Sequence, residues 1–126
     1  NQMSVIEVTG ASFDQLIESD QTVVLDFWAS WCGPCQAFAP VFEAAAEQHS
    51  DALFGKIDVD ANQDLAGYFS VRSVPTLMVL RDKVMLFSHP GALTAGQLEQ
   101  LLQEVKALDM QQVHRDIAAK DAAEKQ

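Results

Sequence analysis

The sequence predicts an α/β fold in which a mixed sheet of about five strands is flanked on both faces by about four helices. Segments with the spacing of buried strands alternate with segments of helical spacing along most of the 126 residues. Ser12 and Thr94 are each followed three positions later by glutamine, a pattern typical of helix starts. Two strand-like segments late in this alternation are separated by a few polar residues, which predicts a hairpin and therefore antiparallel pairing.

The first elements are expected to be a strand, a helix and a second strand. Residues 5–8 are a short strand candidate, and Ser12 is predicted to cap a helix over residues 13–19. Residues 23–28 are apolar on both alternating faces except at Asp26. That pattern is typical of a central strand that is covered on both sides.

A long helix is predicted to begin at Pro34, because proline has no N–H to lose in a first turn. Its apolar stripe consists of Phe38, Val41, Phe42 and Ala45. Pro40 lies inside this helix and is expected to kink it. Residues 53–59 read as the next strand, and Asn62 is expected to cap a short helix that ends near Phe69.

The last predicted elements are a hairpin and a helix. Residues 76–80 and 84–87 are the strands of the hairpin, and Asp82 in its turn is expected to adopt a left-handed conformation. Thr94 is predicted to cap the helix that follows. The apolar residues of that helix are Leu98, Leu101, Leu102 and Val105.

The chain is long enough for one domain, which we expect to span residues 4–107. Residues 1–3 read as a cloning or cleavage remnant, Asn1-Gln2, followed by the native start at Met3. Residues 108–126 carry a thin apolar stripe. They are predicted to be a frayed helical extension, or a helix that packs on the domain or on a second copy of the chain. A monomer is expected, and a dimer formed through this tail is the alternative.

The composition favours a soluble protein that binds neither nucleic acid nor membranes. The formal charge of −10 at pH 7 is opposite to that of the Lys/Arg-rich faces that bind nucleic acid and anionic lipid. No apolar stretch approaches the roughly 20 residues that span a bilayer. No basic segment precedes an apolar one at the N-terminus, so a cytoplasmic location is expected, although removal of a signal segment would leave the same sequence.

Both cysteines of the chain lie in the segment Trp31-Cys32-Gly33-Pro34-Cys35, between a hydrophobic run and the long predicted helix. Thiols two residues apart can close into a small disulfide ring and reopen, which suits exchange with a substrate disulfide. A purely structural bridge is the alternative, but so short a loop adds little to stability.

The same spacing of cysteines also occurs in metal sites. A tetrahedral zinc site needs two further ligands, but there is no second cysteine pair, and His49, His89 and His114 are widely scattered. No metal is therefore expected to bind to a single chain, although two chains could share an iron–sulfur cluster.

Cys32 is predicted to be the attacking sulfur, because it precedes a helix whose first N–H groups and dipole favour a thiolate. Cys35, a turn deeper, would then displace the reduced substrate from the mixed disulfide. Asp26 has apolar neighbours, so burial is expected to raise its pKa toward a value that suits a proton acceptor near neutral pH. The alternative for Asp26 is an ordinary polar residue at a strand margin.

Residues 26–35 resemble the active-site signature of the thioredoxin family almost letter for letter. The likeness continues through residues 56–60, 74–76 and 91–92, and it covers nearly the whole chain except the tail. The resemblance implies a three-layer thioredoxin-like fold and a protein-disulfide reductase with no bound cofactor. Its redox-active disulfide would act on disulfide-containing proteins. A thioredoxin-reductase-like flavoprotein would recharge it, so that NADPH is used only indirectly.

The resemblance also implies roles for individual residues. Asp26 would lie beneath Cys35 and help to deprotonate it, with Lys56 as its charged neighbour on the adjacent strand. The Val74–Pro75 peptide bond is expected to be cis and to face the dithiol, where the backbone of Val74 could pair with an extended substrate. The substrate-binding residues would be Trp31, Gly33, Pro34, Val74, Pro75, Gly91 and Ala92.

Two other functions are alternatives: a thioredoxin-like binding or scaffold subunit, and a dedicated redox partner in an export compartment. The intact Cys32, Cys35 and Asp26 argue against a scaffold, because binding alone does not require them. Gln36 departs from the resembled family, which usually has Lys or Arg after the second cysteine. The positive charge near the Cys32 sulfur is therefore expected to be lower than in the family at large.

Overall fold

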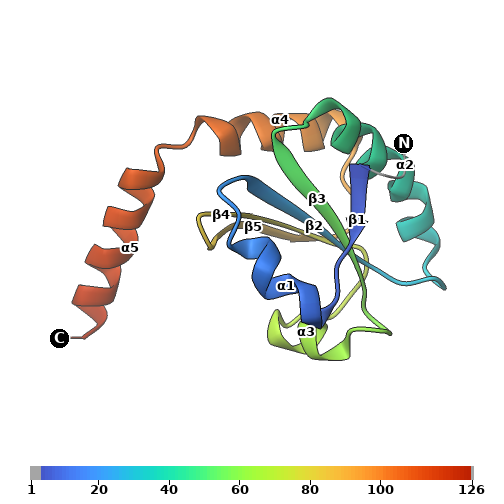
Figure 1. Cartoon of the computed structure of the whole chain (residues 1–126), viewed down its shortest axis with the longest axis horizontal. Coiled ribbons are helices and arrows are strands. Elements are labelled where there is room, and N and C mark those ends of the chain that lie inside the picture. The colour runs from blue at the N-terminus through green and yellow to red at the C-terminus, as the bar shows by residue number, and fades with distance from the viewer. Residues whose placement is uncertain (1–3, 126) are drawn as a thin grey trace.

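The computed structural model describes residues 4–125, which form a five-stranded sheet with helices on both faces (Figure 1). The strands are β1 (Val5–Glu7), β2 (Thr22–Trp28), β3 (Ala52–Asp58), β4 (Thr76–Arg81) and β5 (Val84–Pro90). The helices are α1 (Gly10–Ile17), α2 (Gly33–Gln48), α3 (Gln63–Tyr68), α4 (Ala95–Ala107) and α5 (Met110–Glu124). The remnant and native start predicted at residues 1–3 lie outside the described part of the chain.

The sheet is mixed, as predicted, and its strand order is β1-β3-β2-β4-β5. β1, β3 and β2 run parallel, whereas β4 pairs antiparallel with both β2 and β5. β2 therefore lies in the middle of the sheet, where Val24, Leu25 and Phe27 are fully shielded from solvent. Asp26 lies in this central strand, opposite Lys56 of β3 in the pairing register.

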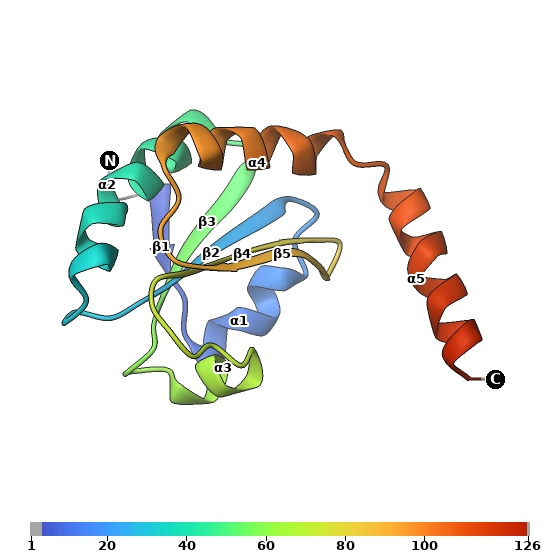
Figure 2. The same cartoon turned by 180° about the vertical axis from the view of Figure 1, so that it is seen from behind.

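The apolar side chains form two main clusters, one on each face of the sheet. α2 and α4 cover one face with side chains that include Phe38, Phe42 and Leu102. α1 and α3 cover the other face with Phe13 and Leu65. Figures 1 and 2 show the sheet between these two pairs of helices from opposite sides. The predicted three-layer arrangement is confirmed.

α1 begins earlier than predicted. Ser12 is the third residue of the helix and not its cap, and its Oγ accepts a hydrogen bond from the Thr9 backbone N–H at 3.0 Å. Thr9 takes the cap position, so the helix starts at Gly10. The prediction from Ser12 and Gln15 was wrong because a serine can occupy either the N-cap or, as here, the third helical position of a capping box. The same pattern at Thr94 does mark the cap of α4, where Oγ1 accepts the Gln97 N–H at 3.1 Å.

The β4–β5 hairpin turns at Asp82 and Lys83, whose φ angles are 54° and 65°. The left-handed conformation predicted for Asp82 is confirmed. Lys83 shares it, because the favoured two-residue hairpin turn needs positive φ at both central residues. β5 is longer than predicted, since its pairing with β4 continues as far as Pro90 opposite Thr76. This extension carries the end of β5 to the start of β4.

The C-terminal segment is a separate helix and not a continuation of α4. Leu108 is extended, and the Asp109 carboxylate caps α5 by accepting the N–H groups of Gln111 at 3.0 Å and Gln112 at 3.3 Å. Met110 is buried, but α5 then projects away from the sheet (Figure 2). None of the helices that the structure describes is both long and apolar enough to cross a bilayer.

Candidate active site

The cysteine pair lies where the segment after β2 enters α2. Cys32 is the N-cap of α2, and it forms a disulfide with Cys35, whose Cα lies 5.3 Å from its own. The backbone N–H of Cys35 donates to the Cys32 sulfur at 3.1 Å. Pro34 lies in the first turn of the helix, as predicted. Once the disulfide is reduced, this N–H and the positive end of the helix dipole favour a thiolate on Cys32.

Burial alone does not distinguish the two sulfurs, since Cys32 is 4% exposed and Cys35 is 3% exposed in the disulfide form. Their surroundings differ. Cys32 is flanked by the exposed residues Trp31 and Gly33, whereas Cys35 lies within α2 and lines a partly open cavity. Cys32 is therefore the sulfur nearer to an approaching partner.

The loop before β4 closes the other side of the sulfur pair. The Val74–Pro75 peptide bond is cis, as predicted, and the Val74 carbonyl oxygen lies 3.6 Å from Cys32 Sγ. Gly91, just after β5, donates its backbone N–H to the Pro75 carbonyl oxygen at 2.7 Å. Its φ angle of 103° lies in a range that favours glycine. The fold thus places the loop before β4 against Cys32, and the segment after β5 against that loop, with the exposed Ala92 following Gly91.

Two polar contacts fix the loop that leads into α2. Trp31 is 70% exposed, and its indole N–H donates to Asp60 Oδ2 at 2.8 Å. Gln36 donates its side-chain amide to the Ser30 carbonyl oxygen at 2.9 Å. Gln36, which departs from the family pattern, therefore stabilises this loop through a hydrogen bond but adds no charge. The sequence pattern marked Trp31 but gave no signal for its pairing with Asp60.

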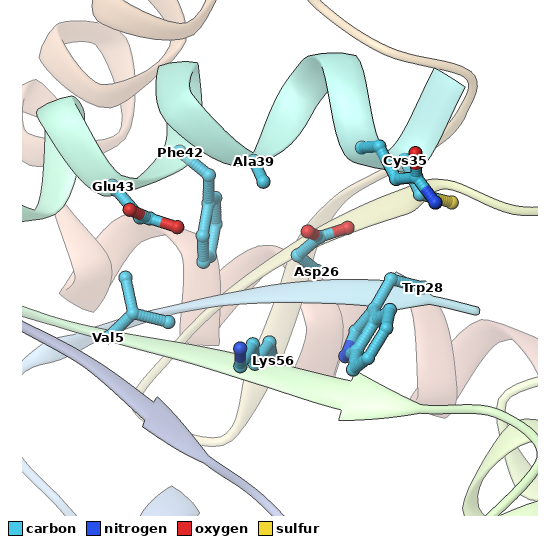
Figure 3. Close-up of a pocket in the computed structure, with 9 residues that line it drawn as sticks. Val5, Asp26, Trp28, Cys35, Ala39, Phe42, Glu43 and Lys56 are labelled. Carbon is cyan, nitrogen blue, oxygen red and sulfur yellow. The ribbon is translucent and has the colours of Figure 1, made fainter. Parts of the chain in front are cut away.

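Asp26 lies below α2, the helix that carries Cys35, and its carboxylate is directed toward this helix (Figure 3). It is 4% exposed, and burial raises its pKa from 3.8 to about 7, an effect that the nearby Lys56 ammonium partly opposes. An aspartate with this pKa can take up or release a proton near neutral pH. Lys56 also lies over the Trp28 ring, with Nζ 5.4 Å from the ring centroid.

A cavity of about 130 Å³ lies beside Asp26 (Figure 3). It is lined by Val5, Asp26, Trp28, Cys35, Gln36, Ala39, Phe42, Glu43 and Lys56. Asp26 Oδ1 and Trp28 Nε1 are buried and have no hydrogen-bond partner within the described residues. Cys35 and Asp26 therefore line the same cavity as two half-buried charged side chains. These are Glu43 and Lys56.

The site offers the chemistry of a sulfur pair and a carboxyl group that can exchange a proton. A disulfide accepts two electrons and two protons to become a dithiol, and the dithiol can return them to another disulfide. Within residues 4–125, no group of three or more His, Cys, Asp and Glu side chains is placed to hold a metal ion.

Comparison with known proteins agrees with this geometry. The family model for thioredoxin matches residues 4–104. A Streptomyces coelicolor protein provisionally named thioredoxin 2 is 43% identical over 119 residues, which cover 94% of this chain and 89% of that protein. A Pseudomonas aeruginosa thioredoxin is 39% identical over 100 residues, which cover 78% of this chain and 93% of the relative. A solved mutant thioredoxin from Halobacterium salinarum superposes with a TM-score of 0.77 at 39% identity, covering 83% of this chain and 93% of that one.

Proposed function

The chain belongs to the thioredoxin family, and from this membership we propose that it is a general reductase of protein disulfides. With its Cys32–Cys35 pair at disulfide distance, it is a thiol-disulfide oxidoreductase. One observation carries the finer proposal: the pair lies at the N-terminus of α2, above the buried carboxyl group of Asp26. A scaffold subunit would need neither the sulfurs nor this carboxyl group.

The proposed reaction has two exchange steps. The Cys32 thiolate attacks one sulfur of the substrate disulfide, and the other substrate sulfur leaves as a thiolate. Cys35 then loses its proton and attacks Cys32, so that the internal disulfide forms and the second substrate sulfur leaves. The substrate gains two electrons and the chain loses two. The Cys35 N–H that donates to Cys32 supports the first step, because a hydrogen bond to the charged form favours a thiolate.

Asp26 is proposed to accept the proton of Cys35 in the second step. Both residues line the same cavity, and a pKa of about 7 lets Asp26 act as a base in one direction and an acid in the other. Lys56 is proposed to stabilise the ionised form, because a neighbouring ammonium favours a carboxylate.

The substrate is proposed to bind to a patch around Cys32. Its proposed contacts are Trp31, Gly33, Pro34, Val74, Pro75, Gly91 and Ala92. Trp31 supports this patch, because an exposed tryptophan beside a reactive sulfur offers a large apolar contact. Val74 supports it as well, since its carbonyl lies against Cys32, where an extended substrate segment could pair with the backbone.

Membership of the family implies disulfide substrates and usually a thioredoxin reductase as partner. We propose that such a flavoprotein recharges this chain with electrons from NADPH, and that the chain works in the cytoplasm. We also propose a domain over residues 4–107 that acts as a monomer, with residues 108–126 as an extension. A dimer through α5 is the alternative, favoured by Ile117, which is 40% exposed.

Reduction of insulin by dithiothreitol tests the proposed reductase. The chain is expected to bring forward the turbidity of the precipitating insulin, and Cys32→Ser is expected to give no acceleration. Turbidity that appears no sooner with the unaltered chain than with dithiothreitol alone would favour a binding or scaffold subunit. Oxidation of NADPH in a second mixture, with a thioredoxin reductase and insulin but without dithiothreitol, tests the proposed partner.

A further inference from the structure

Asp26 needs a route to solvent, because the proposed reaction moves a proton onto and off this buried side chain in every cycle. The cavity beside it offers the space (Figure 3). Two residues that line this cavity, Asp26 and Trp28, each have a buried polar atom with no partner among the described residues. Buried polar atoms in proteins are nearly always hydrogen-bonded, so an acceptor and a donor at one cavity are suited to hold water.

The size of the cavity agrees with water and not with an organic ligand. Its volume of about 130 Å³ has room for about four water molecules at about 30 Å³ each. Binding sites for organic ligands usually exceed about 300 Å³. Water in a cavity also needs polar partners. The lining supplies them as the charged groups of Asp26, Glu43 and Lys56.

A second hollow adjoins this cavity and is lined by Val5, Glu7, Glu43 and Lys56. Val5, Glu43 and Lys56 line both spaces, so they form the boundary between them. Figure 3 shows Glu43 reaching from α2 toward Val5, at the end of the cavity farthest from the sulfur of Cys35. Within the described residues, Glu43 is the one carboxylate that lines both spaces, and it is half-buried.

We propose that Glu43 is the residue through which Asp26 exchanges its proton with solvent. The inference rests on the proposed reductase function. In the second exchange step the Cys35 S–H bond breaks, its proton passes to Asp26, and the sulfur keeps the electron pair with which it attacks Cys32. Asp26 then passes the proton through the water of the cavity to the Glu43 carboxylate, which releases it to a buffer base in the second hollow. Glu43 touches neither substrate nor sulfur, so it is a positioning residue that acts through Asp26.

Rescue by buffer tests this role. When the reduced chain is mixed with an aromatic disulfide, one aromatic thiolate is released as Cys32 is captured, and another as Cys35 resolves the mixed disulfide. At pH 6, below the pKa of about 7 of Asp26, most of this side chain carries a proton that it must lose before it can accept the proton of Cys35. In dilute buffer at this pH, Glu43→Gln is therefore expected to slow the second release about threefold to tenfold, a fraction of what a general acid or base contributes. Concentrated imidazole is expected to restore the rate to within about twofold of the unaltered chain, because it accepts the proton in place of Glu43. Glu43→Asp keeps a carboxylate and is expected to keep most of the rate.

Glu104→Gln on α4 is the matched control, since it removes the same charge at an exposed position that lines neither space. It is expected to match the unaltered chain at both buffer concentrations. The proposal is wrong if Glu43→Gln resolves at the full rate in dilute buffer. It is also wrong if Glu43→Gln slows the second release and imidazole does not restore the rate. Such a result would indicate that the substitution acts through lost packing or charge, which a buffer cannot replace. If the unaltered chain fails to resolve the mixed disulfide, the proposed reductase function is wrong. If the unaltered chain resolves it and Glu43→Gln does so equally fast, only the role proposed for Glu43 is wrong.

Discussion

At the scale of single residues, Asp26 links the chemistry of the site to the stability of the fold. Its pKa is 3.8 in the absence of the fold and about 7 within it, so between these values the folded chain holds a proton that the unfolded chain has lost. The stabilisation from this proton is fully present below about pH 4 and is lost as the pH rises through about 7. A rise of about three units corresponds to about 4 kcal/mol, because each unit is worth about 1.4 kcal/mol.

Asp26→Asn is expected to raise the free energy of unfolding at pH 8 by about 2–4 kcal/mol, because the amide has no charge to bury. The gain is expected to shrink toward zero below pH 4, where the aspartate is protonated in both states. Urea unfolding of both proteins at pH 4, 6 and 8 measures the difference. A gain of equal size at every pH would mean that burial of the charge is not its cause.

The residues of the site differ in how far the sequence could predict them. The sulfur pair and Asp26 have local signals, since each stands out from its neighbours in a strand or at a helix start. Asp60 has no such signal, because it meets Trp31 across 29 residues of sequence. Glu43 has none either, because it reaches the cavity only when α2 packs above the sheet. Contacts of this kind depend on how elements pack and not on the pattern within any one of them.

At the scale of elements, the periodicity of apolar residues predicted the kinds of elements well, but some of their ends depend on distant contacts. No glycine or proline marks the break between α4 and α5. The Arg81 guanidinium, from β4, donates to the carbonyl oxygens of Val105 at 3.0 Å and Leu108 at 3.2 Å and so satisfies the end of α4. The Asp109 carboxylate satisfies the start of α5. The pattern of residues around Leu108 does not predict the contact with Arg81, which lies 27 residues away in the sequence.

Asp109→Ala is expected to unravel the start of α5, since loss of a capping side chain costs a helix about 0.5–2 kcal/mol. The helical signal in circular dichroism is expected to fall, while the cooperative unfolding of the sheet stays at nearly the same temperature. Asp121→Ala removes the same charge within α5 without removing the cap, and it is expected to keep the signal. A full helical signal in Asp109→Ala would show that α5 does not depend on this cap.

At the scale of the whole molecule, both main apolar clusters and every residue of the proposed site lie in the part of the chain that precedes α5. α5 adds one buried residue, Met110, and is otherwise mostly exposed. This division supports the proposed boundary after residue 107 and predicts that the extension can be removed without loss of the chemistry.

Deletion of residues 109–126 is expected to leave insulin reduction unchanged. It is expected to lower the free energy of unfolding by about 1–2 kcal/mol, because the burial of Met110 is lost. Sedimentation equilibrium at micromolar concentration is expected to give the 13.8 kDa mass of a monomer for the full chain. A dimer that disappears on deletion would instead identify α5 as an interface between two copies.

α5 leaves the molecule at the end opposite the loop that holds the cysteines, as Figures 1 and 2 show. A solid support or a fluorescent label attached beyond this helix would therefore stand clear of an incoming polypeptide. Immobilised in this way, a Cys35→Ser variant would hold each captured protein through Cys32 with no internal thiol to release it. The proteins eluted from such a column by a reducing agent would be the natural targets of the chain.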